Sequence, residues 1–292
     1  MKKNCAFIGL GVMGYPMAGH LKKKGFNVTV YNRTAAKAEQ WKKEYGGEAA
    51  ATPAEAAKNA DFVMVCVGND QDVRSVVTGK DGVLASMKAG TTLIDHTTAS
   101  PKLAVEMAGE CKKKNVSFLD APVSGGQAGA VNGALTIMIG GEEAVHENAK
   151  AVIDCYAKQQ VLIGAHGHGQ ACKMLNQTCI AGLLQGLSEG IFLAEKSGID
   201  LKKALAAISK GAAQSWQMEN RGETMIKNEF DFGFAVDWMR KDLDICLSSA
   251  KEKGITLPVT EKVKGYYDEL SAAGFNRSDT SSLIALLRKK NK

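Results

Sequence analysis

Three polar side chains on one face of a predicted helix are the strongest candidates for chemistry in this sequence. Lys173, Asn176 and Gln177 are spaced i, i+3 and i+4, so they project from the same side of the helix. A lysine can give or take a proton during a reaction when its surroundings bring its pKa towards neutrality. The alternative is a partly exposed helix end with the lysine in solvent, and this stretch alone leaves both interpretations open.

The helix that carries these residues is predicted to extend from His168 to Lys196. Its apolar residues recur at helical spacing, no proline interrupts it, and Gly198 fits a C-terminal stop. Such a length is unusual in a globular domain and suggests an element that belongs to two domains. A glycine-rich segment precedes the helix, so we predict domains at residues 1–164 and 165–292.

A second candidate site is a glycine-rich turn near the N-terminus. An apolar segment at residues 5–8 is followed by G-x-G-x-x-G, then by a helical segment at 15–24 and an apolar strand at 28–31. Glycines in the turn of such a β-α-β unit let the backbone approach a pyrophosphate at a helix N-terminus. The alternative is a purely structural glycine turn. The predicted cofactor-binding residues here are Gly9, Gly11, Val12, Met13 and Gly14.

The residues after the second strand favour NADP(H) over NAD(H). A protein that prefers NAD usually places Asp or Glu there to accept a hydrogen bond from the ribose 2′-hydroxyl. This chain has Asn32, Arg33 and Thr34 instead. Arginine pairs with a 2′-phosphate, and a carboxylate would repel that phosphate. The alternative is a surface arginine that starts the next helix and leaves the cofactor preference loose.

Further strands and helices alternate through the first domain. Apolar strands are predicted at residues 62–67, 91–95, 116–119, 135–139 and 160–163. This alternation predicts an α/β fold with a doubly wound Rossmann sheet. Ligands bind outside the carboxyl ends of strands in such sheets. We therefore expect the strand-end residues to converge near the cofactor, namely Val67, Gly68, Thr98 and Ser124.

Strand signals vanish beyond Asp200, and amphipathic helical segments dominate the rest of the chain. Helices are predicted at residues 201–210, 215–228, 239–253, 258–273 and 280–289. The second domain is therefore predicted to be all-α and to follow the long interdomain helix. An aromatic loop at 230–234 is interpreted as core or domain interface.

Composition excludes several classes of protein. The 292 residues are 45% hydrophobic and 23% charged, and no segment approaches the roughly 20 apolar residues of a membrane span. Seven scattered cysteines without a C-x-x-C pair suit a reduced cytoplasmic protein. No metal-ligand spacing is present apart from His166 and His168 in a loop, so no metal is predicted. The net charge is +6, and the sequence has no stripe of basic residues interleaved with aromatic residues. These properties suit a small anionic substrate and not nucleic acid.

These residues resemble the β-hydroxyacid dehydrogenase family over the whole chain. Four blocks carry the resemblance, at residues 7–18, 120–126, 164–177 and 241–243. The family includes 3-hydroxyisobutyrate dehydrogenase, tartronate semialdehyde reductase and glyoxylate/succinic semialdehyde reductase. The resemblance implies a Rossmann domain joined by a long helix to an all-α domain, and a homodimer or homotetramer.

The resemblance also implies roles for individual residues. Lys173 matches the catalytic lysine, and Asn176 (or Gln177) matches the amide that orients the substrate. Thr98 matches a position near both nicotinamide and substrate. The turn that holds the substrate carboxylate is matched by Ser124, Gly125 and Gly126.

Other matches lie in the second domain. Lys241 matches a cofactor contact, Phe234 an active-site aromatic, and Asp242 a residue close to the active site. For Asp242, a helix N-terminal carboxylate paired with an arginine is an open alternative. The Asn-Arg-Thr segment looks like the NADP-binding variant of the semialdehyde reductase branch. One departure is His96, where the family more often has Met, and we expect it to alter the pocket wall.

The implied function is hydride transfer between NADP(H) and a small semialdehyde/hydroxy acid pair, with Lys173 as general acid/base. The main alternative is a 3-hydroxyisobutyrate or serine-type 3-hydroxy acid dehydrogenase that uses NAD. The presence of Lys173 disfavours a non-catalytic scaffold, and also an imine reductase, which typically has Asp or Tyr there. The helical domain is too short for a 6-phosphogluconate dehydrogenase.

Overall fold

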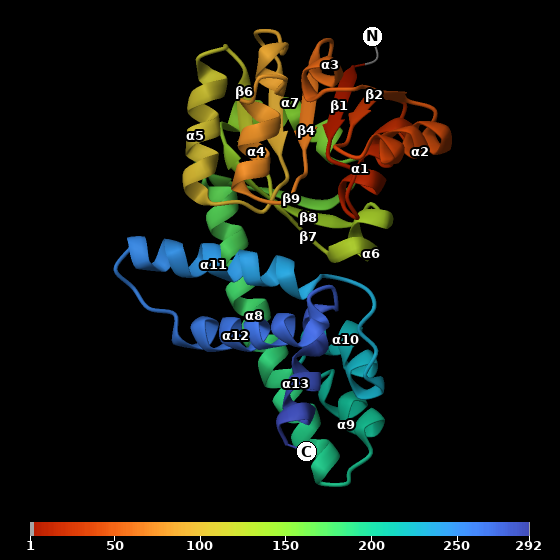
Figure 1. Cartoon of the computed structure of the whole chain (residues 1–292), viewed down its shortest axis with the longest axis vertical. Coiled ribbons are helices and arrows are strands. Elements are labelled where there is room, and N and C mark those ends of the chain that lie inside the picture. The colour runs from red at the N-terminus through yellow and green to blue at the C-terminus, as the bar shows by residue number, and fades with distance from the viewer. Residues whose placement is uncertain (1–2, 292) are drawn as a thin grey trace. The chain divides into compact units, whose positions relative to one another are not determined.

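The computed structural model describes residues 3–291 and contains two compact units. The first extends to Lys173 and the second begins at Met174, so the division falls inside the long helix and not at Gly164. Figure 1 shows the chain coloured by residue number.

The first unit is built on a sheet of nine strands among the described residues. The strand order is β3-β2-β1-β4-β5-β6-β8-β7, and β9 pairs with β8. The strands from β3 to β6 are parallel, whereas β6 and β7 are both antiparallel to β8. The strands are β1 (Asn4–Ile8), β2 (Asn27–Tyr31), β3 (Glu48–Ala49), β4 (Phe62–Val65), β5 (Thr92–Asp95), β6 (Ser117–Asp120), β7 (Val123–Ser124), β8 (Leu135–Gly141) and β9 (Ala157–Gly164).

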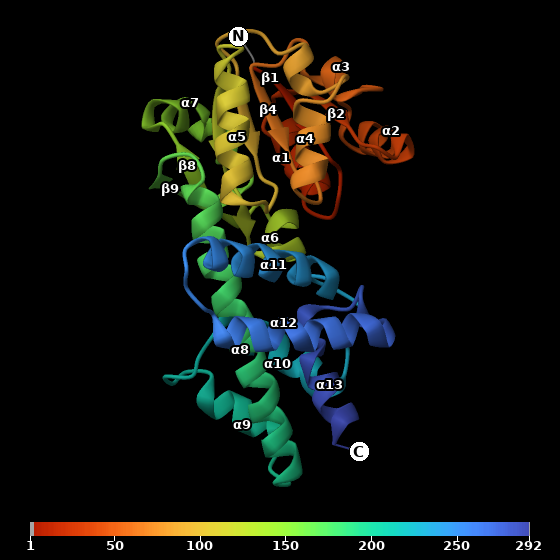
Figure 2. The same cartoon turned by 60° about the vertical axis from the view of Figure 1, so that its left-hand side comes forward.

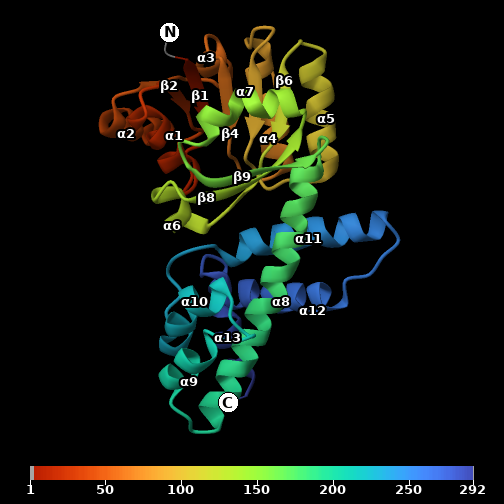
Figure 3. The ribbon, with the colours of Figure 1, turned by 180° about the vertical axis from the view of Figure 1, so that it is seen from behind.

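Helices cover both faces of this sheet, as the predicted doubly wound fold requires. Figure 1 shows α4 and α5 in front of the strands, and Figure 3 shows α7 from the opposite side. Alternate residues of β1 enter different cores, with Phe7 on one face and Ile8 on the other. The helices are α1 (Gly14–Lys23), α2 (Ala35–Tyr45), α3 (Pro53–Ala57), α4 (Asp70–Val77), α5 (Pro101–Lys112), α6 (Gly126–Val131) and α7 (Glu143–Ile153).

Helix α8 (His168–Lys196) begins in the first unit and continues into the second, with the bounds that the sequence predicts. The second unit is helical, and Figure 2 shows α11 and α12 side by side. Its core contains Leu184 of α8, Met239 of α11 and Tyr267 of α12. The other elements are α9 (Leu201–Ile208), α10 (Trp216–Lys227), α11 (Val236–Glu252), α12 (Pro258–Leu270), a π-helical turn (Ser271–Phe275), a 3₁₀ turn (Thr280–Ser282) and α13 (Leu283–Lys290).

Some predicted elements differ in detail from the observed ones. The predicted strand 62–67 ends at Val65, and Cys66 to Gly68 form the connection to α4. Val123 and Ser124, predicted as loop, form the short strand β7 against β8. The predicted helix 258–273 leaves α-helical geometry at Ser271, since Gly274 has a φ of +89°. Each difference arises from pairing or backbone geometry that hydrophobic periodicity does not encode.

Three features of residues 3–291 bear on the class of protein. No helix there is long and apolar enough to cross a membrane. No cluster of three or more His, Cys, Asp or Glu side chains in that range is arranged to hold a metal ion. The seven cysteines, all within it, form no disulfide.

The buried end of β5 gives the fold a pH-dependent stability. Burial raises the pKa of Asp95 to about 7, more than the hydrogen bonds from Thr97 lower it. The folded protein therefore retains a proton that the unfolded chain releases near its ordinary pKa of about 3.9. The contribution to the free energy of unfolding is present below pH 4 and is lost as the pH rises to about 7.

We expect Asp95→Asn to remove this pH dependence, because an amide does not titrate in this range. The amide oxygen can still accept a hydrogen bond from the Thr97 N–H, which lies 2.9 Å from Asp95 Oδ1. The Tm of the variant should gain on that of the wild type as the pH rises from about 4 to about 7. Thermal unfolding at a series of pH values measures this, with the exposed Asp81→Asn as control. Parallel Tm curves for wild type and Asp95→Asn would contradict the assignment.

Candidate active site

The glycine turn after β1 has the form that a dinucleotide requires. A Cβ on Gly9 would collide with the Cys66 carbonyl oxygen, and one on Gly14 with the Gly9 carbonyl oxygen. Gly9 also has a φ of +98°, which an L side chain rarely adopts. A Cβ on Gly11 would instead meet no atom within 4 Å. Two glycines therefore close the turn, and the third leaves open space above it.

Helix α1 begins at this open space and presents backbone N–H groups there. Met13 stands at its N-cap position without a side-chain cap hydrogen bond, and Gly11 and Val12 are exposed. Uncapped N–H groups and the helix dipole favour an anion at this position. The arrangement fits the pyrophosphate of a dinucleotide.

Asn32 at the end of β2 holds the turn in place. Its Oδ1 accepts a hydrogen bond from the Leu10 N–H at 2.9 Å, and its Nδ2 donates to the Thr34 carbonyl oxygen at 3.1 Å. Arg33 lies beside it with 89% of its side chain exposed, and Arg33 Nη1 is 3.7 Å from Asp72 Oδ1. Thr34 is exposed at the start of α2. No carboxylate occupies the strand end, and the arginine is accessible.

The loops after β4 and β5 are joined by side-chain hydrogen bonds. The Val67 N–H donates to Thr97 Oγ1 at 3.1 Å, so Val67 and Gly68 lie next to the segment that contains Thr98. Gln170 holds that segment on both sides of Thr98. Its Nε2 donates to the Thr97 carbonyl oxygen at 2.7 Å, and its Oε1 accepts from the Ala99 N–H at 3.0 Å.

Gln170 is not among the site residues that the sequence predicts. The available signal was its spacing, because Gln170 lies three residues before Lys173 on the same predicted helix face. Its side chain is fully buried and its amide bonds to two backbone groups of one loop. The residue fixes the position of Thr98 relative to the start of α8.

Asp120, at the end of β6, holds the start of α8. Its Oδ1 accepts from the Gly167 N–H at 2.8 Å, and its Oδ2 accepts from the Gln170 N–H at 2.9 Å. A Cβ on Gly169 would lie 2.6 Å from the carbonyl oxygens of Asp120 and Met138, so the first turn of α8 packs directly on strand backbone. Burial raises the pKa of Asp120, and the backbone hydrogen bonds oppose that shift.

Lys173 lies one helical turn further along and is buried. Its Nζ donates to the Val123 carbonyl oxygen at 2.9 Å. Ser124, Gly125 and Gly126 follow directly, and both glycines have positive φ, at +129° and +61°. The structure therefore brings the predicted catalytic lysine to the turn predicted to hold the substrate carboxylate.

Three predicted residues form a hydrogen-bonded chain within the second unit. Asn176 Nδ2 donates to Gln177 Oε1 at 2.7 Å, and Gln177 Nε2 donates to Asp242 Oδ2 at 2.6 Å. Lys241 Nζ lies 3.0 Å from Asp242 Oδ1. The alternative for Asp242 was wrong: it lies in the interior of α11 and pairs with lysine, not at a helix N-terminus with arginine.

Phe234 is held separately from this chain. Its N–H donates to Asp279 Oδ2 at 2.9 Å, and Asp279 is buried and pairs with Arg221 at 3.0 Å. The Phe234 ring packs against the core that contains Met239, and Phe230 is buried in a separate cluster, whereas Phe232 of the same loop is exposed.

His96 is a core residue and does not form a pocket wall. Its Nδ1 lies 2.7 Å from the Ala121 carbonyl oxygen and its Nε2 lies 2.9 Å from the Tyr156 hydroxyl. A carbonyl only accepts, so we assign Nδ1 as the donor and Nε2 as the acceptor from Tyr156. Burial lowers the pKa of His96 to about 4, which keeps the ring neutral at physiological pH.

Two family descriptions match almost the entire chain. The one described as the NAD binding domain of 6-phosphogluconate dehydrogenase matches residues 4–164. The one described as the NAD-binding domain of NADP-dependent 3-hydroxyisobutyrate dehydrogenase matches residues 167–287. The chain belongs to the β-hydroxyacid dehydrogenase family. It is an NAD(P)-dependent oxidoreductase, and a nicotinamide dinucleotide is its cofactor.

Individual relatives of this dehydrogenase agree with the assignment. An uncharacterized oxidoreductase of Shewanella frigidimarina is 57% identical over 97% of this chain and 98% of its own. A probable 3-hydroxyisobutyrate dehydrogenase-like protein of Arabidopsis thaliana is 41% identical over 98% of this chain and 85% of its own. The solved 3-hydroxyisobutyrate dehydrogenase of Mycobacterium tuberculosis, studied with L-serine, has a TM-score of 0.90 at 29% identity, covering 99% of this chain and 100% of its own.

The open space above Gly11 gives a test of the cofactor site that is separate from folding. We expect Gly11→Ala to keep the wild-type Tm, because the added Cβ meets no protein atom within 4 Å. It should weaken NADPH binding by about tenfold or more, since the methyl group occupies the space that the pyrophosphate approaches. Fluorescence titration and thermal unfolding measure the two effects.

Gly14→Ala is the matched comparison for this variant, because its Cβ would collide with the Gly9 carbonyl oxygen. It should lose both binding and stability. Wild-type NADPH affinity in Gly11→Ala would show that the dinucleotide does not cross this turn.

Proposed function

We propose that this dehydrogenase is an NADP(H)-dependent reductase of a small semialdehyde or 2-oxo acid such as succinic semialdehyde or glyoxylate. Lys173 is its general acid. The observation that carries the proposal is the buried Lys173 ammonium, which donates to the Val123 carbonyl oxygen beside Ser124. A buried lysine with a backbone acceptor, next to a turn of serine and two glycines, suits an anionic substrate whose carbonyl needs a proton.

The proton transfer follows from that position. When bound, the nicotinamide supplies or accepts the hydride at the carbinol carbon. Lys173 Nζ exchanges its hydrogen bond to Val123 for one to the substrate oxygen, and it protonates that oxygen as the alkoxide develops. In the oxidative direction the same Nζ accepts the hydroxyl proton. Only the lysine carries the proton in this scheme.

The neighbouring groups bind and orient the substrate. The Ser124 hydroxyl and the backbone N–H groups of Gly125 and Gly126 hold the substrate carboxylate without placing a second full charge beside Lys173. Thr98, kept in place by Gln170, contacts both nicotinamide and substrate. Asn176, one turn beyond Lys173 on α8, orients the substrate hydroxyl or carbonyl.

The second unit contributes further residues in this proposal. Lys241 contacts the cofactor, and Phe234 and Asp242 border the substrate. Asp242 and Gln177 also fix the Asn176 amide through their chain of hydrogen bonds. An amide with a defined orientation presents its oxygen and its remaining N–H at fixed positions, which a freely rotating amide does not.

NADP(H) is the proposed cofactor because of what surrounds the ribose position. Asn32 anchors the glycine turn as a carboxylate would, but without a negative charge. The exposed Arg33 guanidinium is available to pair with a 2′-phosphate. The family description that matches residues 167–287 also names an NADP-dependent enzyme.

A second candidate is oxidation of 3-hydroxyisobutyrate or a serine-type 3-hydroxy acid with NAD. Support comes from the 3-hydroxyisobutyrate dehydrogenase names of two of the relatives described above. Asp72 also supports it, because its carboxylate lies 3.7 Å from Arg33 and competes with a phosphate for that side chain. We further propose that the enzyme is cytoplasmic, in keeping with seven cysteines that form no disulfide. We also propose that it forms a homodimer or homotetramer.

Replacement of Lys173 tests the proton-transfer role. Lys173→Met keeps most of the buried aliphatic stem and removes the ammonium, so kcat should fall by about 10³-fold. NADPH affinity should stay within a few-fold of the wild type, because the Lys173 ammonium bonds to the Val123 carbonyl beside the proposed substrate turn. Lys196→Met, at the far end of the same helix, is the control. Turnover retained in Lys173→Met would remove the assignment.

Replacement of Arg33 tests the cofactor preference. Arg33→Ala should raise the Kd for NADPH by at least about tenfold, since one charge-assisted phosphate contact is lost. The Kd for NADH should be unchanged and serves as the internal control. The substrate screen uses glyoxylate, succinic semialdehyde, methylmalonate semialdehyde and tartronate semialdehyde with each cofactor. Tighter NADH binding by the wild type, or activity only on hydroxyisobutyrate or serine, would favour the second candidate.

A further inference from the structure

Arg33 and Asp72 form a contact between the two loops that flank the glycine turn. Arg33 Nη1 lies 3.7 Å from Asp72 Oδ1. Arg33 follows β2, and Asp72 lies in the first turn of α4, which follows β4. Strands β2 and β4 are the two neighbours of β1, and the glycine turn follows β1. The contact therefore bridges the edge of the sheet along which a dinucleotide extends in this fold.

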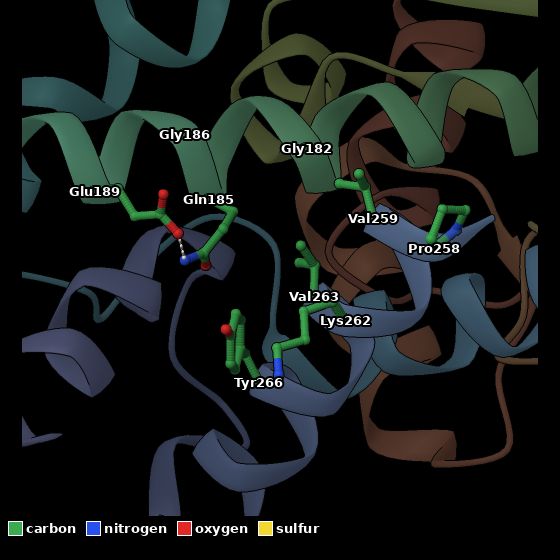
Figure 4. Close-up of a pocket in the computed structure, with 9 residues that line it drawn as sticks. All are labelled: Gly182, Gln185, Gly186, Glu189, Pro258, Val259, Lys262, Val263 and Tyr266. Atoms are coloured by element: carbon green, nitrogen blue, oxygen red, sulfur yellow. Dashed lines mark hydrogen bonds between the residues drawn. The ribbon is translucent and has the colours of Figure 1, made fainter.

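This contact differs from the local polar pairs that lie on single helices. Gln185 Nε2 donates to Glu189 Oε1 at 2.7 Å, and Figure 4 shows this pair in a close-up of residues from α8 and α12. A pair at i, i+4 spacing supports the helix that carries it. Arg33 and Asp72 lie far apart in sequence and on different elements, so their contact supports no single helix and instead joins two cofactor loops.

The rest of α4 fixes the position of the Asp72 carboxylate. Asn69 Oδ1 caps the helix by accepting from the Asp72 N–H at 3.0 Å, and the next residue, Val73, is buried in the core. The neighbouring Asp70 uses both carboxylate oxygens to bind Ser100, whose N–H donates at 3.0 Å and whose hydroxyl donates at 2.6 Å. Asp72 is therefore the first-turn carboxylate that turns towards Arg33, and its negative charge stays in one place.

Arg33 is the less constrained member of the pair. Its side chain is 89% exposed, whereas that of Asp72 is 33% exposed. An exposed ion pair contributes little to stability, because water and salt screen it and two long side chains lose freedom in forming it. The guanidinium can therefore leave Asp72 for another anion at small cost.

A 2′-phosphate is the anion that the proposed function brings to Arg33. A phosphate monoester carries about −1.5 to −2 charges at neutral pH, whereas NADH has an uncharged hydroxyl at the same position. Asp72 therefore acts differently on the two cofactors. It competes with the phosphate for Arg33 and repels its charge, and it exerts no comparable repulsion on the hydroxyl.

We propose that Asp72 is a specificity-determining residue that limits the preference of this enzyme for NADP(H) over NAD(H). The inference rests on the proposed role of Arg33 as the phosphate reader and adds the carboxylate that opposes it. Dehydrogenases that prefer NAD usually carry their discriminating acid at the end of β2. In this chain Asn32 occupies that place and holds the glycine turn, and the acid comes from α4 instead.

A purely structural role for Asp72 makes a different prediction. A carboxylate in the first turn of a helix interacts favourably with the helix dipole, and its loss lowers the Tm whichever cofactor is present. A charge near the 2′ position changes the affinity for NADPH and leaves that for NADH almost unaltered. The ratio of the Kd for NADH to the Kd for NADPH therefore separates the two roles.

Asp72→Asn should raise this ratio by about fivefold at low salt, because NADPH binding no longer works against a fixed negative charge. Fluorescence titration of the apo protein with each cofactor measures the two constants, and the Kd for NADH should stay within about twofold of the wild type. At 1 M salt, where the Debye length is about 3 Å, the gain should shrink to less than about twofold.

Two further variants separate the charge of Asp72 from other effects. Asp72→Glu keeps the negative charge and should keep the wild-type ratio within about twofold. Asp81→Asn changes the net charge by the same amount at an exposed residue beyond the other end of α4, and it should also leave the ratio unchanged.

An unchanged ratio in Asp72→Asn, or an equal shift in Asp72→Glu, would overturn the proposal. Arg33→Ala distinguishes this failure from failure of the proposed function. If Arg33→Ala weakens NADPH binding while Asp72→Asn leaves the ratio unchanged, Arg33 reads the phosphate and Asp72 has no part in selectivity. If neither variant changes the affinity for NADPH, the proposed NADP(H) site is itself wrong.

Discussion

The structure depends most on the carboxylate of Asp120 at the start of α8. It accepts hydrogen bonds from two N–H groups, those of Gly167 and Gln170, that the helix itself cannot satisfy. The N-terminal end of a helix dipole favours a negative charge there. Because this contact joins β6 to α8 directly, it fixes the rotation of the helix and hence the side on which Lys173 emerges.

Three parts of the candidate site share this one anchor. Gln170 lies in the first turn of α8 and binds the loop around Thr98 from both sides. Lys173 lies one turn later and binds the Val123 carbonyl beside Ser124. A displacement of the helix start would therefore disturb the contact of Gln170 with the Thr98 loop and the contact of Lys173 with Val123 together. The close approach at Gly169 leaves little room for such a displacement.

The sequence predicts the elements of the fold well, because their signals are local. The bounds of α8 and the glycine turn follow from apolar spacing and glycine positions that need no distant partner. Three features could not be predicted that way. The pairing of β7 with β8, the binding of Gln170 to the Thr98 loop and the burial of His96 all depend on residues far apart in sequence.

In the candidate site, too, residue types could be predicted from the sequence, whereas contacts between distant residues could not. Lysine and glycine types predict where chemistry occurs, and the resemblance to a family implies roles for them. Asn32 illustrates what was missed, since residue type alone suggests a phosphate donor, whereas its side chain accepts from Leu10 and donates to Thr34.

The most direct measurement follows a labelled hydride through a single turnover. Wild-type enzyme is mixed with NADPH that carries deuterium at both hydrogens of nicotinamide C4 and with succinic semialdehyde or glyoxylate, and the product is analysed by ²H NMR. The account predicts one deuterium on the carbinol carbon of the hydroxy acid, formed at a rate that falls with loss of the Lys173 ammonium. Deuterium retained in the cofactor, with no labelled hydroxy acid from either substrate, would contradict it.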